Sequence, residues 1–184
     1  MKHAHTRKFD HAFHWPQPPL NVVLVEPEIP PNTGNIARMC AATGSRLHLI
    51  EPLGFNITDA QLKRAGLDYW DAIAPVVHAS WDDYLAAEKP ARLHLFSTGG
   101  SKNVFTTDFQ PGDHLVFGSE TRGLSDELLA HYPGRIIGIP LRTEHVRSLN
   151  LSTAAGIAVY EALRQIQHVS ESTLVREGEA PAEP

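Results

Sequence analysis

The sequence predicts an α/β fold, a parallel β-sheet with helices on both faces. Short apolar runs of strand length alternate along the chain with segments of helical period. Several runs are apolar at consecutive positions, which is typical of strands buried on both faces. A length of 184 residues, with 42% hydrophobic and 20% charged residues, indicates one globular domain. These values exclude a coiled coil, collagen and a wholly disordered chain.

The first half of the domain opens with two apolar runs that flank a helical segment. The run NVVLVE predicts a strand over 21–26, and RLHLIE predicts another over 46–51. Between them, residues 33–43 have helical period, and Gly44 is placed to end that helix. The next predicted helix, 58–70, opens with a capping box of Thr58 and Gln61.

The rest of the domain continues the alternation. Three further apolar runs predict strands, and three segments of helical period predict helices, the last of them long. The strands are expected over 92–97, 114–118 and 135–140, and the helices over 80–88, 125–131 and 151–168.

The two ends of the chain differ from the predicted domain, 20–169. Residues 1–19 hold three basic residues against one acidic and four of the eleven histidines, while 170–184 hold four acidic residues against one basic. Both are expected to be disordered tails. The histidine pairs near the N-terminus have no thiolate or carboxylate framework beside them, so no metal site is expected there or elsewhere.

Several functional classes are excluded. No apolar run reaches the roughly 18 residues of a membrane span, and the first residues lack the apolar core of a secretory signal. The single Cys40 allows no intramolecular disulfide and is expected to be a buried structural thiol, so a cytoplasmic protein is expected. The dinucleotide fingerprint, the P-loop and the G-x-S-x-G elbow are all absent.

Polar, glycine-rich and proline-rich segments follow the predicted strands, where ligands bind in parallel sheets. Arg38 points away from the apolar face of its helix, either into solvent or towards a phosphate or a developing anion. Gly118 and Gly123 indicate backbone in close approach or at positive φ, and Gly156 indicates close packing of the last helix. These segments are 27–35, 98–103, 119–124 and 141–150.

Three of these stretches together resemble the SPOUT superfamily of knotted methyltransferases, in its ribose 2′-O-methyltransferase branch. The motifs are PPNTGNIAR (30–38), FGSETRGL (117–124) and IPLRTEHVRSLNLSTAAGIAVYEALRQ (139–165), supported by LHLIEPLGF (47–55) and RAGLDYW (64–70). The resemblance covers residues 20–167. It implies a C-terminal deep trefoil knot, a homodimer, and S-adenosylmethionine bound in the knotted loops.

The resemblance also implies roles for particular residues. Arg38, with Asn35 beside it, would face the ribose, and Glu120 and Asn150 would line or support the cofactor pocket; these four are the expected catalytic residues. Because a guanidinium stays protonated, Arg38 is better suited to stabilise a developing alkoxide than to act as a base. The residues implied for cofactor binding are Phe96, Ser97, Thr98, Gly118, Ile139, Leu141, Ser148 and Leu151.

The activity that the resemblance implies is methylation of the ribose 2′-hydroxyl of the wobble nucleotide, position 34, in leucine tRNAs, as in small bacterial members of the family. The nucleotide would be cytidine or a modified uridine. Two alternatives stay open: a ribose methylase for another tRNA or rRNA site, and a catalytically silent, dimeric RNA-binding module.

Overall fold

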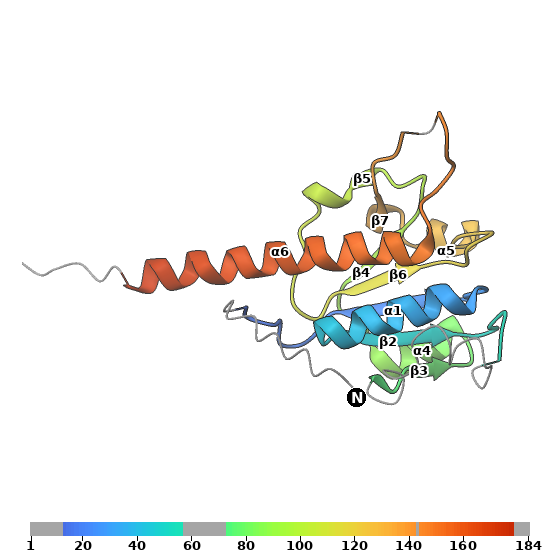
Figure 1. Ribbon diagram of the computed structural model, residues 1–184, viewed down its shortest axis with the longest axis horizontal. Helices are drawn as coiled ribbons and strands as arrows, with labels where there is room; N and C mark the ends of the chain where they lie inside the picture. The colour runs from blue at the N-terminus through green and yellow to red at the C-terminus, as the bar shows by residue number, and fades with distance from the viewer. Residues whose placement is uncertain (1–12, 57–72, 143, 179–184) are drawn as a thin grey trace, which may run out of the picture.

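A computed structural model describes residues 13–56, 73–142 and 144–178, with side chains as far as Gln167. Seven parallel strands form one sheet in the order β3-β2-β1-β6-β4-β7-β5 (Figure 1). The strands are β1 (Asn21–Val25), β2 (Arg46–Ile50), β3 (Val76–His78), β4 (Leu93–Phe96), β5 (Lys102–Asn103), β6 (His114–Phe117) and β7 (Ile136–Gly138). The helices are α1 (Pro30–Thr43), α4 (Trp81–Glu88), α5 (Asp126–His131) and α6 (Leu151–Gly178), with 3₁₀ turns η2 (Val104–Thr106) and η3 (Pro133–Arg135).

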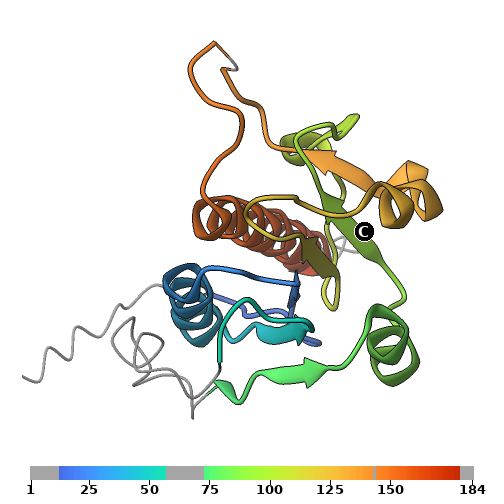
Figure 2. The ribbon, with the colours of Figure 1, turned by 90° about the vertical axis from the view of Figure 1, so that its right-hand side faces the viewer.

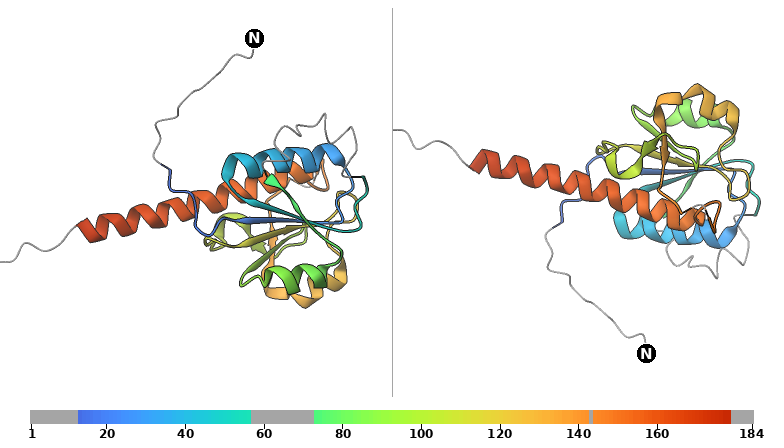
Figure 3. Two further views of the ribbon diagram at one scale, coloured as in Figure 1. Left: turned by 90° about the horizontal axis from the view of Figure 1, so that it is seen from below. Right: turned by 90° about the horizontal axis from the view of Figure 1, so that it is seen from above.

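The helices cover both faces of the sheet, which confirms the predicted fold class. Helices α1 and α6 lie on one face, and α4 and α5 lie on the other (Figures 2 and 3). Alternate residues of the strands supply the two cores: Val22 and Leu24 of β1 face α1 and α6, while Val23 faces α4. The trefoil knot stays a prediction.

The sequence prediction missed two strands and began the first helix three residues too late. β3 and β5 were not expected, because β3 has only three residues, two of them exposed, and β5 has two polar residues. α1 begins at Pro30 rather than at residue 33, since proline fits the first turn of a helix. The predicted helix over 58–70 lies outside the described residues.

At both ends the structure extends beyond the predicted domain, 20–169, into the segments predicted to be tails. α6 continues to Gly178, so residues 170–178 are helical instead of disordered (Figure 1). At the other end, the backbone N–H of His14 donates a hydrogen bond to Gln167 Oε1 at 3.0 Å, and Pro16 is buried. The ordered chain therefore begins before residue 20.

Cys40 has the structural role that was expected. Its side chain lies in the core between α1 and the sheet and is 1% exposed. Burial raises the pKa of the Cys40 thiol to about 12, so the thiolate is not formed at neutral pH. Among the described helices, none combines the length and the apolarity needed to span a bilayer.

A buried imidazole is expected to make the fold sensitive to acid. His114 Nδ1 lies 2.5 Å from the Tyr84 hydroxyl, among His48, Asp113 and Arg46. Burial lowers the pKa of His114 from 6.5 to about 4; the Asp113 charge opposes this effect, and Arg46 adds to it. Between these two pH values the unfolded chain binds more protons at this residue than the folded chain does, so the free energy of unfolding falls as the pH drops.

We therefore expect the urea midpoint to decrease progressively from about pH 6.5 to pH 4. Urea titrations at several pH values, followed by circular dichroism, measure this decrease. A midpoint that stays level down to pH 4 and falls only below it would show that the buried imidazoles, His114 and also His48, whose pKa burial lowers to about 3, do not cause the acid lability.

Candidate active site

A cavity of about 530 Å³ opens beyond the carboxyl ends of β4, β6 and β7. Its walls come from the loops that follow these three strands, from the start of α1 and from the start of α6. Every residue expected to bind the cofactor lines it: Phe96, Ser97, Thr98, Gly118, Ile139, Leu141, Ser148 and Leu151. Glu120 and Asn150 line it as well. A cavity of this size accommodates a ligand as large as a nucleoside derivative.

Glu120 ties the loop after β6 to the start of α1. Its carboxylate accepts hydrogen bonds from the backbone N–H groups of Glu28 (2.8 Å) and Ile29 (3.2 Å) and from Asn32 Nδ2 (2.9 Å). No side chain of the helix itself caps α1, and its first two positions are prolines. The negative charge of Glu120 also lies at the positive end of the helix dipole.

Asn32 continues this connection to α6. Asn150 Nδ2 donates to Asn32 Oδ1 at 2.8 Å, while Asn150 Oδ1 accepts from the backbone N–H groups of Ser152 (2.9 Å) and Thr153 (3.3 Å). Asn150 is therefore the N-terminal cap of α6. The chain Glu120–Asn32–Asn150 joins three loops that lie far apart in the sequence and fixes their spacing around the cavity.

A second set of contacts joins the same two loops, but here the β1–α1 loop supplies the carboxylates and the loop after β6 supplies the donors. The Thr121 hydroxyl donates to the Glu28 carboxylate at 2.7–2.8 Å, and Arg122 forms a 2.8 Å ion pair with Glu26. Glu120 and Arg122 thus bind the β1–α1 loop and not each other. Much of the Arg122 charge is already compensated within the chain.

The backbone packed against position 118 leaves room only for a glycine there. A Cβ atom there would lie 2.0 Å from the carbonyl carbon of Gly123 and 2.1 Å from the nitrogen of Leu124. Gly123 closes this turn at φ 71°, donating its N–H to the Ser119 carbonyl at 2.9 Å. The resemblance implies a cofactor-binding role for Gly118, but the turn over 118–124 already requires glycine at this position.

Two of the expected catalytic residues lie outside the cavity. Arg38 is exposed on α1, opposite the buried Ile36, Ala37 and Cys40, as the helical period predicts. It lies about 9 Å along the helix axis from Asn32, at 1.5 Å per residue. Asn35 is also exposed and is not a lining residue.

Asn32 is the asparagine of this motif that reaches the cavity, and the sequence analysis missed it as a site residue. The observed N-cap of α1 is Ile29, so Asn32 does not cap its own helix. An asparagine at a helix start usually serves its own helix. Only the sheet topology, which places β1 next to β6, brings Asn32 to Glu120.

Glu120→Gln should weaken the site strongly. The amide would place an NH₂ group against one of the N–H donors of Glu28, Ile29 or Asn32 and would remove the charge. We expect the affinity for S-adenosylmethionine to fall at least about 10-fold, measured by calorimetry. Glu127→Gln, an exposed carboxylate on α5, is the matched control. Equal affinities of the two variants would contradict this role of Glu120.

A parallel sheet with a ligand cavity formed by the loops after β4, β6 and β7 and by the cap of the last helix defines a SPOUT methyltransferase fold. The chain belongs to the SpoU rRNA Methylase family, whose pattern matches residues 19–160. This confirms the family that the three motifs indicated.

Individual relatives are similar over most of the chain. A tRNA (cytidine(34)-2'-O)-methyltransferase of Burkholderia pseudomallei is 53% identical over 148 residues, which cover 79% of this chain and 94% of that protein. The Escherichia coli K12 protein of the same name is 50% identical over 148 residues, covering 80% and 94%.

Solved structures of RNA methyltransferases are also similar to this chain. One that concerns 2-OH methylation of C/U34 on tRNA is 48% identical, with a TM-score of 0.75, and the match covers 79% of this chain and 95% of that one. The SpoU methyltransferase AviRb from Streptomyces viridochromogenes, in complex with the cofactor AdoMet, is 27% identical with a TM-score of 0.67, covering 79% and 57%.

Proposed function

We propose that this chain is an S-adenosylmethionine-dependent methyltransferase that acts on the ribose 2′-hydroxyl of tRNA nucleotide 34, a cytidine or modified uridine of leucine tRNAs. The observation that carries the proposal is the cavity itself: its lining coincides with all eight residues that the family resemblance assigns to cofactor binding. Relatives of about 50% identity, matched over more than nine-tenths of their own length, carry the name of this activity. The proposed location is the cytoplasm.

The cavity fits the proposed cofactor chemically. Phe96 and Phe117, both buried lining residues, stack with ring centroids 4.6 Å apart, while Ser97, Thr98 and Ser148 offer hydroxyl groups to the cavity. Such a mixture of apolar wall and few polar groups suits an adenosine with a charged tail. When bound, S-adenosylmethionine would supply a methyl group on a sulfonium centre.

The chain's residues would then position the RNA. Arg38, with its planar guanidinium, would bind the phosphate beside the target nucleotide and stabilise negative charge on the 2′-oxygen as its proton leaves. The proton would pass to a nearby water or phosphate oxygen. Glu120, Asn32 and Asn150 would hold the loops at their spacing, so that orientation supplies much of the rate.

Two measurements test the function. Mapping of 2′-O-methylation in tRNA from cells with and without this protein should show methylation lost at position 34 of leucine tRNAs alone. Loss at another tRNA or rRNA position would assign the activity to a different ribose. Calorimetry with S-adenosylmethionine separates an enzyme from a silent RNA-binding module, since the silent module would not bind the cofactor.

The proposed working unit is a homodimer. Val159, Leu163 and Ile166 of α6 are buried in the chain's own core and therefore cannot form an interface. Another face of α6 is exposed. Tyr160 is 57% exposed, and a Cβ atom added at Gly156, one turn earlier, would have no neighbour within 4 Å. The close packing expected at Gly156 is absent within the described chain, and a second subunit would supply it.

Mixed dimers test whether Arg38 acts on the cofactor bound by its partner. Arg38→Ala subunits would be combined with Thr98→Trp subunits, in which a large side chain replaces a lining residue of the cavity and should block cofactor binding. If Arg38 acts across the interface, two inactive variants should together regain about a quarter of wild-type activity, because half of random dimers are mixed and each holds one complete site. Absence of complementation would place Arg38 in the site of its own chain, and a monomeric mass for active protein would exclude the dimer.

A further inference from the structure

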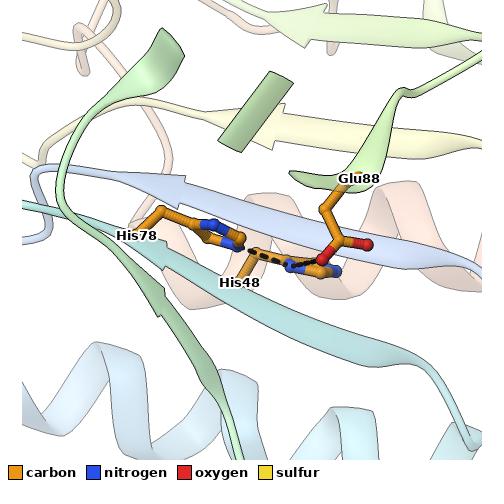
Figure 4. A group of neighbouring side chains, drawn as sticks. All are labelled: His48, His78 and Glu88. Carbon is orange, nitrogen blue, oxygen red and sulfur yellow. Dashed lines mark hydrogen bonds and ion pairs between the residues drawn. The ribbon is translucent and has the colours of Figure 1, made fainter. Parts of the chain in front are cut away.

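Two histidines and a glutamate meet on the face of the sheet opposite α1 and α6, away from the cavity. His48 of β2 is 0% exposed, His78 of β3 is 6% exposed, and Glu88 ends α4 (Figure 4). His48 Nδ1 lies 3.1 Å from His78 Nε2 and 3.8 Å from Glu88 Oε1. The three ligand atoms all lie within 4.8 Å of one another.

The tautomer of His48 follows from its other neighbour. His48 Nε2 lies 3.3 Å from Asn21 Oδ1. The orientation of the Asn21 amide is fixed because its Nδ2 donates to the carbonyls of Gly112 (3.2 Å) and Pro19 (3.4 Å). Asn21 Oδ1 therefore only accepts, and His48 Nε2 carries the proton.

It follows that His48 Nδ1 presents a lone pair towards His78 and Glu88. His78 Nε2, 3.1 Å away, either donates its own proton to this lone pair or presents a second lone pair to an ion that lies between the two rings and the Glu88 carboxylate. A metal-bound histidine characteristically donates its other N–H to a carbonyl oxygen, as His48 does to Asn21.

We propose that His48 Nδ1, His78 Nε2 and Glu88 Oε1 bind one divalent transition-metal ion of the zinc class. Ligands about 2.0–2.1 Å from a tetrahedral Zn²⁺ lie roughly 3.3 Å apart. The observed separations are 3.1 and 3.8 Å, with the third pair within 4.8 Å, so a small rotation of the Glu88 side chain would complete the set. Two imidazoles and one carboxylate are a common zinc set, with water in the fourth position. This site was not expected from the sequence, where only the N-terminal histidine pairs were considered.

The ion would link three elements at the edge of the sheet. β3 is the outermost strand, has three residues and pairs only with β2 among the described strands. A metal bridging β2, β3 and the last residue of α4 would hold this edge in place. The site lies outside the cavity lining, so the proposal is independent of the methyltransferase function.

The test uses the full chain, stripped of metal with a chelator and titrated with Zn²⁺ against a chromophoric competitor. A background in which His3, His5, His11 and His14 are replaced by alanine removes the N-terminal histidine pairs. We expect one Zn²⁺ per chain in that background, a Co²⁺ spectrum of four-coordinate intensity, and a Tm about 5–10 °C higher at 100 times Kd.

Glu88→Gln keeps the side-chain shape and should weaken Zn²⁺ binding at least about 10-fold, and His78→Gln should weaken it further. Asp82→Asn, on the exposed side of the same helix, is the matched control and should bind as the parent does. Zinc bound only when the N-terminal histidines are present, or bound equally by Glu88→Gln and Asp82→Asn, would overturn the proposal. So would the absence of binding in the parent chain.

Discussion

Replacing Arg38 with alanine is expected to slow methyl transfer by at least about 100-fold while leaving the affinity for S-adenosylmethionine within a few-fold. The physical reason is the separation of the two parts of the site. The cavity lining does not include Arg38, which is exposed on α1 about 9 Å beyond Asn32. Removing its guanidinium would therefore remove the proposed RNA contact and the proposed stabiliser of developing charge, but no wall of the cavity.

Single-turnover methylation of a tRNA substrate and calorimetry with the cofactor measure the two quantities separately. Arg38→Lys should recover little activity, because a compact ammonium group does not replace a planar, bidentate one. Arg135→Ala, an exposed arginine next to β7, controls for general loss of positive charge. If Arg38→Ala instead destroyed cofactor binding, the division into a cofactor side and an RNA side would be wrong.

The parts of the fold that follow from local pattern were predictable. Each long apolar run became a strand, and each described segment of helical period became a helix, because both patterns express burial on the sheet. The strands β3 and β5 were missed for the same reason. Val76 and Val77 are exposed and Lys102 is charged, so neither strand carries the apolar signal of a buried one.

The parts of the site that could be predicted are those in which a residue contacts its neighbours in the sequence. Asn150 caps α6 through contacts two and three positions along the chain, and the helix predicted from residue 151 begins directly after it. The partners of Glu120 lie about 90 residues earlier in the chain, and no local rule connects them. Asn32 was missed because its two long-range contacts exist only once β1 and β6 are adjacent.

The same distinction applies to His48 and His78, which are 30 residues apart in two different strands. Neither stands in a recognisable ligand spacing with the other or with Glu88. Parallel pairing of β2 with β3, with His78 opposite Ile50, places both imidazoles on one face of the sheet. A cluster of this kind depends on strand register, which periodicity does not specify.

Gly118→Ala should have the second large effect: a loss of about 3 kcal/mol in the free energy of unfolding together with loss of cofactor binding. The added methyl group would overlap backbone atoms of Gly123 and Leu124, which cannot rotate away as a side chain could. The turn over 118–124 would have to open, and Thr121 and Glu120 would then lose their contacts with Glu28.

Gly123→Ala in the same turn is the matched control, because it adds the same methyl group where nothing lies within 4 Å. Its φ of 71° costs an alanine only about 1–2 kcal/mol. Urea unfolding and calorimetry of both variants separate two explanations of Gly118. If the glycine only admits the cofactor, Gly118→Ala keeps its stability and loses affinity alone. If it closes the turn, as the overlap with Gly123 indicates, stability and affinity fall together, and by more than in Gly123→Ala.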